Sequence, residues 1–465
     1  MKHGQPSFPG KLSAKILERY REHAPDSMGD TSPLVWERAE GCRVWDADGR
    51  EYIDFTSGVL VLNVGHSHPR VTAAIVEQAG KFLNCYDATS EVIVAFQEQL
   101  AELLPPALRK IILLTTGSEA IEAAVRIARA ATGRHEILAF SGAFHGRTHM
   151  AMTLGGMQGI KQGFGPVAPG VIRLYYPYCY RCLFDKSYPG CRLYCFRHIE
   201  HAIQTESSGS IAALLIEPYL GSGGAVAAPK EYIQKVREFC RRQDILFIFD
   251  EVQSSFGRSG SMFAFEQVGI EPDIVCLGKG ISSGVPMSAV AMRTDLAKSV
   301  RRGAFGSTYG GFNPLACAAG LATLSVLREE GVVENARRMS LWIMKRLKDI
   351  QRRSPIVGDV RGMGLSLGVE FVTDRESRQP AGELAQEVSR LALTNGLALL
   401  SHAGGIHNNV IRLMPPLTID KGTAEKGLRI FEDAIQHVHE HRGRVLHKPK
   451  YLTAKLAKSA KRARI

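Results

Sequence analysis

Two residues whose side chains could do covalent chemistry follow apolar runs in the middle of the chain. Asp250 ends the run ILFIF at residues 245–249, and Lys279 stands between two glycines after the run DIVCL at residues 273–277. A lysine that forms a Schiff base and a carboxylate that pairs with a pyridinium nitrogen are what pyridoxal 5′-phosphate (PLP) requires. Taken alone, the pair is a weak signal, because both placements are common in proteins.

The elements that must position this pair are strands buried on both faces. Unbroken apolar runs of this length are typical of central parallel strands covered by helices. Similar runs occupy 111–115, 136–140 and 211–217, and amphipathic helices are expected after residue 118 and over 230–243. The alternation over 110–290 predicts an α/β fold with a large, doubly wound, mostly parallel sheet. Ligands bind such sheets beyond the carboxyl ends of the strands.

A second functional signal lies at the end of the strand at 111–115. The strand leads through Thr116, Gly117 and Ser118 into a helix that Gly133 ends. Strand, small residues and helix N-terminus form an arrangement that binds phosphate through backbone N–H groups. The simpler interpretation is that Gly117 and Ser118 only begin the helix.

Composition limits the class of protein. The chain has 465 residues, 45% hydrophobic and 22% charged, which is typical of a globular protein with two or three subdomains. No apolar run reaches about 18 residues, so we expect no membrane span. The N-terminus lacks an apolar signal segment, and nine scattered cysteines favour a reducing compartment, so a cytoplasmic location is expected.

The charge is unevenly placed. The net charge is +12, and nine of the 58 Lys and Arg residues follow residue 440, where no Asp or Glu occurs. We therefore expect four segments: an N-terminal arm with part of a small domain (1–62), a large PLP-binding domain (63–335), a C-terminal small α+β domain (336–440) and a disordered basic tail (441–465). Such a tail could bind nucleic acid electrostatically, but nothing in it predicts a base-reading module.

Four cysteines gather in one stretch. Cys179, Cys182, Cys191 and Cys195 lie within a Pro- and aromatic-rich segment, with spacings Cys-x2-Cys and Cys-x3-Cys. Four thiols could bind zinc tetrahedrally, although the second spacing is loose. We assign no metal ligand here, and structural zinc is left as an alternative.

Over roughly residues 30–438 the sequence resembles the class III (ω-amino acid) PLP-dependent aminotransferases, which have PLP fold type I. The resemblance lies in motifs in matching order: DFTSG, GHSHP, TTGSEAIEAA, GAFHGRT, IEPYLGSGG, FDEVQSSFGRSG, LGKGI, STYGG, GDVRGMGLSLGVEF and NNVIRLMPPLTI. The chain is similar to 4-aminobutyrate aminotransferases and to 2,2-dialkylglycine decarboxylase.

The resemblance implies a role for each matching residue. Lys279 would bind PLP covalently and act as the general base, and Asp250 would pair with the pyridine nitrogen. Arg412 would hold the substrate α-carboxylate and Arg147 a distal carboxylate. Thr308 would reach the phosphate of the neighbouring subunit's PLP, which implies a homodimer or a dimer of dimers. The other cofactor contacts would be Gly117 and Ser118 (phosphate), Phe144 and Val252 (ring faces), Gln253 (ring oxygen) and His145.

Two departures from the family leave the reaction open. Ser222 stands where many dual-specificity members carry a Glu that neutralises the arginine, so Arg412 would stay free to bind a carboxylate in both half-reactions. Dialkylglycine decarboxylase shares this Ser but has Gln at the position of Val59, and Val59 cannot form its hydrogen bond. We expect transfer of an amino group from an amino acid, such as 4-aminobutyrate or another ω-amino acid, to a 2-oxo acid. Decarboxylating transamination and racemisation are the alternatives, and a non-enzymatic nucleic-acid-binding protein is a remote one.

Overall fold

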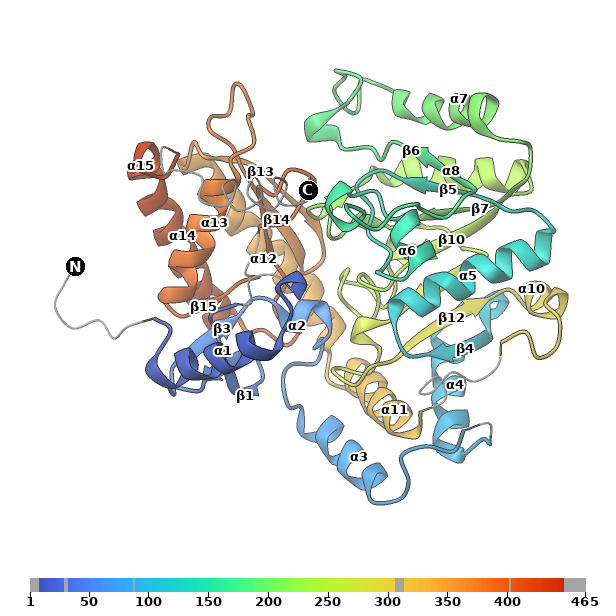
Figure 1. The fold of residues 1–465 in the computed structure, drawn as a ribbon, viewed down its shortest axis with the longest axis horizontal. Helices are drawn as coiled ribbons and strands as arrows, with labels where there is room; N and C mark the ends of the chain where they lie inside the picture. The colour runs from blue at the N-terminus through green and yellow to red at the C-terminus, as the bar shows by residue number, and fades with distance from the viewer. Residues whose placement is uncertain (1–7, 29–31, 87, 306–312, 401–402, 447–465) are drawn as a thin grey trace, which may run out of the picture.

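The computed structural model describes residues 8–28, 32–86, 88–305, 313–400 and 403–446. Figure 1 shows two lobes: a large one built on the central part of the chain and a smaller one that combines the N- and C-terminal parts. Thr308 and residues 447–465 of the expected tail lie outside the described residues. No helix in the described ranges is long and apolar enough to cross a membrane.

A seven-stranded sheet forms the large lobe, which confirms the predicted fold class. Its order is β4-β12-β11-β10-β7-β5-β6, and only β12 runs antiparallel to its neighbours. The strands are β4 (Lys110–Leu114), β5 (Glu136–Phe140), β6 (Val171–Leu174), β7 (Ile211–Ile216), β10 (Leu246–Asp250), β11 (Ile274–Leu277) and β12 (Ser288–Met292).

The central strands are buried on both sides because their alternate residues join different cores. Phe247 and Phe249 of β10 pack into one hydrophobic cluster, whereas Leu246 and Ile248 pack into a second one together with α5. Covering each face in this way explains the continuous apolar runs in the sequence. The helices of this lobe are α3 (Pro69–Ala79), α4 (Glu91–Leu103), α5 (Gly117–Thr132), α6 (His149–Leu154), α7 (Arg197–Glu206), α8 (Lys230–Arg242), α9 (Ala264–Val268), α10 (Thr294–Ser299) and α11 (Pro314–Glu329).

Two sheets form the small lobe. The sheet β1-β2-β3-β15 comprises β1 (Trp36–Glu40), β2 (Arg43–Asp46), β3 (Glu51–Asp54) and β15 (Leu397–Ala398). The sheet β13-β14-β16 comprises β13 (Val357–Met363), β14 (Ser366–Phe371) and β16 (Val410–Leu413). Because β15 pairs in parallel with β3, both ends of the chain contribute to this lobe. Its helices are α1 (Lys11–His23), α12 (Val332–Arg353), α13 (Gly382–Thr394), α14 (Lys421–Glu440) and α15 (Arg442–Leu446).

Two details refine the expected segments. The helical region after Pro314 is two helices, because Gly331 adopts a left-handed φ of 65° between α11 and α12. The expected domain limit at residue 335 falls inside α12, and α15 occupies the start of the expected tail. The domain limits themselves stay a prediction. Short elements complete the chain: α2 (Ser57–Leu60), β8 (Tyr219–Leu220), β9 (Val226–Ala227) and 3-10 turns at Asp26–Met28, Pro106–Leu108, Gln158–Ile160, Cys179–Arg181, Tyr194–Phe196 and Lys279–Ile281.

A fully buried arginine ties the two lobes together. Arg258, in the loop after β10, donates through Nη2 to Ser57 Oγ (3.1 Å) and Asn63 Oδ1 (2.9 Å). Its Nη1 donates to the carbonyls of Leu365 (3.0 Å) and Pro415 (2.6 Å). Segments from both ends of the chain therefore meet around one side chain of the large lobe.

Candidate active site

A cavity of about 360 Å³ lies beyond the carboxyl ends of the central strands. This is where parallel sheets bind ligands, and the volume suits a cofactor with a small substrate. Nine of the residues proposed from the sequence line it together: Gly117, Ser118, Phe144, His145, Arg147, Asp250, Val252, Gln253 and Lys279. Ser222, Arg412 and Val59 are not among the lining residues.

Asp250 is held at the tip of β10 by two neighbours. Its buried carboxylate accepts a hydrogen bond from the backbone N–H of Val252 at 3.0 Å, and Nδ1 of His145 lies 2.7 Å from Oδ2. A carboxylate at this hydrogen-bond distance from a buried imidazole is fixed in direction. It is therefore suited to hold the proton of a heterocyclic nitrogen in the cavity.

Lys279 begins the turn that follows β11 and adopts a left-handed φ of 45°. A Cβ on the next residue, Gly280, would lie 2.2 Å from the Asn63 side chain, so only glycine fits there. Burial lowers the pKa of Lys279; Arg412 adds to this effect, and Asp250 opposes it. A lowered pKa raises the fraction of neutral amine, which is the nucleophilic form.

The N-terminus of α5 forms one end of the cavity. Thr116 caps the helix by accepting from Glu119 N–H, and the first N–H groups of a helix have no partner inside it. A Cβ at Gly117 would lie 2.8 Å from Val252 Cγ1, so the cavity wall requires glycine there. The phosphate contacts expected of Gly117 and Ser118 stay a prediction.

The polar groups around the cavity fit PLP. The side-chain atoms Thr115 Oγ1, His145 Nε2, Gln253 Oε1 and Arg412 Nε are buried without a hydrogen-bond partner in the described structure. Unpaired buried polar atoms are costly, and three of these four belong to residues that line the cavity (Thr115, His145 and Gln253), which indicates a polar ligand there. PLP has groups that would satisfy them: a ring nitrogen, a ring oxygen and a phosphate.

Glu217 is a site residue that sequence reasoning missed. Its carboxylate, at the end of β7, accepts from the N–H groups of Phe144 and Gly221, each at 2.9 Å. Burial raises the pKa of Glu217 above its ordinary value, against the effects of His145 and of these two donors. Glu217 thus fixes both the loop that carries Phe144 and the turn at Gly221. An apolar run that ends in an acid, as at Asp250, was the available signal.

The substrate residues expected from the sequence come from both lobes. Arg412 on β16 donates through Nη1 to the carbonyl of Gly221 at 3.3 Å, and burial lowers the pKa of its guanidinium. Ser222 Oγ accepts from Gln253 Nε2 at 3.5 Å. Arg147 is exposed at the cavity wall, and its guanidinium carbon lies 6.0 Å from the centroid of the Phe144 ring. A half-buried and an exposed cation are therefore available for carboxylates.

Val59 lies away from this arrangement. Its side chain is 43% exposed and its φ is 66°, whereas Val61 of the same segment lines the cavity. The expected contact of Val59 with substrate stays a prediction.

The four cysteines of the segment lie around one small cavity, and zinc binding there stays an untested alternative. Cys179, Cys182, Cys191 and Cys195 are free thiols that line a small cavity of about 30 Å³. Among the described residues, no three His, Cys, Asp or Glu side chains are arranged to hold a metal ion.

Comparisons with known proteins agree with this geometry. Residues 26–435 match the family Aminotransferase class-III. The chain is 38% identical to 5-aminovalerate aminotransferase of Pseudomonas aeruginosa, over 92% of this chain and 99% of the relative. It is 36% identical to 4-aminobutyrate aminotransferase of Escherichia coli, again over 92% and 99%. It is also 36% identical to leucine/methionine racemase of Thermococcus litoralis, over 92% and 96%.

The fold is shared with solved structures. An amine transaminase from an uncultivated Pseudomonas species, solved with PLP bound, superimposes with a TM-score of 0.83 at 29% identity. The match covers 89% of this chain and 97% of that chain.

Proposed function

We propose that this chain, which belongs to the class-III aminotransferase family and has PLP as its cofactor, moves the amino group of an ω-amino acid to a 2-oxo acid. Two relatives with high coverage are named for 4-aminobutyrate and 5-aminovalerate, which are ω-amino acids. The observation that carries the proposal is the pair of arginines, Arg147 at the cavity wall and Arg412 from the small lobe. Two separate cations suit a donor and an acceptor that each carry a carboxylate.

PLP, when bound, supplies an electron sink for the carbanion formed at the amino-bearing carbon. The chain's own groups provide the rest. Asp250 would hold the proton on the ring nitrogen, and Gln253 would serve the ring oxygen. Lys279 would hold the cofactor through its amine, and its Nζ would move the proton at the substrate carbon. Arg412 orients the acceptor by its α-carboxylate, and Arg147 orients the ω-amino donor by its distal carboxylate.

The test is a visible absorption spectrum of the PLP-loaded enzyme while single donors are added. The panel contains 4-aminobutyrate, 5-aminovalerate, β-alanine, alanine, ornithine and 2-aminoisobutyrate. We expect the PLP band to be lost with 4-aminobutyrate and 5-aminovalerate and to return when a 2-oxo acid is added. Persistence of the band with every donor would contradict the proposal. Release of CO₂ with 2-aminoisobutyrate would favour the decarboxylating alternative.

Racemisation is a second candidate, because a relative named leucine/methionine racemase is about as similar as the aminotransferases. Both reactions begin with removal of a proton from the substrate carbon. Chiral chromatography of L-leucine incubated with the enzyme separates them. Formation of D-leucine without oxo acid would make racemisation the main activity.

We also propose that the chain acts in the cytoplasm as a homodimer or a dimer of dimers. The support is the resemblance of the segment around Thr308 to one that reaches the partner's cofactor. Light scattering coupled to size exclusion should give a mass at least twice that of the 50.9 kDa chain. A monomer that keeps full activity would overturn the assembly, and recovery of the enzyme outside the cytoplasmic fraction would overturn the location.

A further inference from the structure

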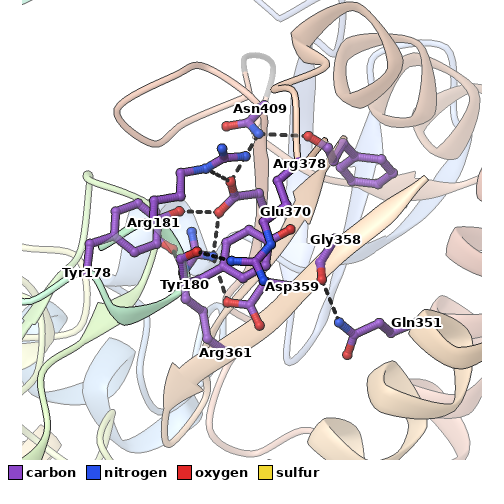
Figure 2. Close-up of polar contacts among 12 residues, drawn as sticks. Tyr178, Tyr180, Arg181, Gln351, Gly358, Asp359, Arg361, Glu370, Arg378 and Asn409 are labelled. Carbon is purple, nitrogen blue, oxygen red and sulfur yellow. Dashed lines mark hydrogen bonds and ion pairs between the residues drawn. The ribbon is translucent and has the colours of Figure 1, made fainter. Parts of the chain in front are cut away.

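A buried charge cluster lies where the two lobes meet, away from the cofactor cavity. At its centre, Glu370 of β14 has no solvent exposure. Its carboxylate accepts from the hydroxyl of Tyr178, from Arg181 Nε (2.5 Å) and from Arg361 Nη1 (2.6 Å), as Figure 2 shows. Asn409 Nδ2 also donates to it at 3.3 Å.

The partners of Glu370 come from both lobes. Tyr178 and Arg181 belong to the cysteine-rich connection between β6 and α7 of the large lobe, whereas Arg361 lies on β13 of the small lobe. Oδ2 of Asp359 lies 3.0 Å from Nη1 of Arg361. The two cations of the cluster, Arg181 and Arg361, are therefore balanced by two carboxylates, those of Glu370 and Asp359. Burial acts to raise the pKa of Glu370, but Arg361, the Tyr178 hydroxyl and Arg181 outweigh it and lower this pKa. The carboxylate is thus ionised and fully paired, as a buried charge must be.

Arg361 connects this cluster to the substrate arginine. Its Nε donates to the carbonyl of Gly224 at 2.9 Å. Gly224 belongs to the turn between β8 and β9, in which Gly221 accepts from Arg412 at 3.3 Å. The carbonyl of Ser222, in the same turn, accepts from Gly405 N–H at 3.1 Å. Three donors of the small lobe therefore bind three carbonyls of one turn.

The cluster and Arg412 also share one sheet. On paired strands β14 and β16, Gly368 is opposite Arg412 and Glu370 is opposite Val410. A short hydrogen-bonded ladder transmits small displacements without much internal flexing. The position of Glu370 therefore fixes where the backbone of Arg412 lies relative to the turn.

We propose that Glu370 and Arg361 are positioning residues that hold Arg412 in the direction required to bind the α-carboxylate of the oxo acid. Neither is among the residues that line the cofactor cavity. The inference rests on the proposed function, since it gives Arg412 the α-carboxylate. It predicts a selective effect on substrate binding. Binding of the oxo acid should depend on this cluster, whereas binding of an ω-amino donor, which is held through Arg147, should not.

The main test is Glu370→Gln in the PLP-loaded enzyme. The variant keeps the shape but removes the charge that holds Arg181 and Arg361. We expect KM for 2-oxoglutarate to rise about tenfold, which corresponds to about 1.4 kcal/mol, and KM for 4-aminobutyrate to stay within about twofold. The dissociation constant for glutarate, which cannot react, should rise in calorimetry. The visible spectrum of bound PLP should not change.

Two further variants keep the test decisive. Tyr178→Phe removes a single hydroxyl from Glu370 and should give the same selectivity with a smaller effect, even if Glu370→Gln folds poorly. Glu425→Gln breaks another partly buried ion pair of the small lobe, with Arg346 at 3.3 Å, and should change neither KM. An equal rise of both KM values, or no change in glutarate binding, would overturn the proposal.

The experiments also distinguish failure of the proposed function from failure of this inference. If the wild-type enzyme transaminates but Arg412→Lys leaves KM for the oxo acid unchanged, the role of Arg412 is wrong, and this inference is overturned with it. If the wild-type enzyme transaminates no donor, the proposed function is wrong, and glutarate binding to Glu370→Gln still decides whether the cluster positions a carboxylate site.

Discussion

Replacing Lys279 with alanine is expected to lower turnover with 4-aminobutyrate by at least about 10⁴-fold, because both covalent attachment and proton transfer use this amine. The position at the end of β11 puts Nζ in the same cavity as Asp250. The measurement is single-turnover loss of the PLP absorption band after donor addition. Added methylamine should restore part of the rate, since a free amine can take over the proton transfer.

A control separates this chemistry from loss of folding. Lys110→Ala, at the exposed start of β4, should keep wild-type turnover and circular dichroism. Lys279→Ala should match it in circular dichroism, because alanine and lysine meet the same restriction at a φ of 45°. Turnover of Lys279→Ala close to the wild-type value would exclude the proposed role.

Asp250→Asn is expected to lower turnover by about 10²- to 10³-fold, the usual cost of removing one preorganised electrostatic contact. The amide cannot hold a proton on the ring nitrogen, so the electron sink weakens. It can still accept from Val252 N–H and contact His145, so PLP should stay bound. Steady-state turnover and the PLP content of the dialysed variant are the two measurements.

Chemical complementation makes the Asp250 test specific. PLP methylated on the ring nitrogen carries a permanent positive charge and should recover much of the lost rate in Asp250→Asn. The matched control is Asp244→Asn, at the exposed opposite end of β10, which should behave as wild type. Loss of PLP from Asp250→Asn, or no gain with the methylated cofactor, would show that the carboxylate serves binding alone.

The sequence was sufficient to predict the central sheet, because its main parallel strands are continuous apolar runs. Asp250 pairs in register with Cys276, three residues before Lys279, so neighbouring strands alone bring the pair together. The antiparallel strand β12 was not predicted, because Ser288–Met292 is rich in small residues. Glu217 was seen only as a strand end, since its partners are backbone N–H groups, which leave no trace in residue types.

Contacts between segments that are far apart in the sequence could not be predicted from local sequence patterns. Arg412 was assigned to the site only through the family resemblance, because nothing local marks a strand arginine as a ligand for substrate. The Tyr178–Glu370 contact joins residues 192 positions apart, one of them in an irregular connection. Such pairs depend on how the lobes pack, which hydrophobic periodicity does not specify.

The buried guanidinium of Arg258 should couple the stabilities of the two lobes. A fragment that ended near residue 335 would remove the carbonyls of Leu365 and Pro415 and leave a desolvated cation with half its bonds. Leaving a buried polar group without its hydrogen-bond partner costs roughly 1–3 kcal/mol, and more for a charged group, which is a large part of the stability margin of many proteins. The two lobes should therefore unfold in a single cooperative transition, and neither should be obtainable as an autonomous folding unit.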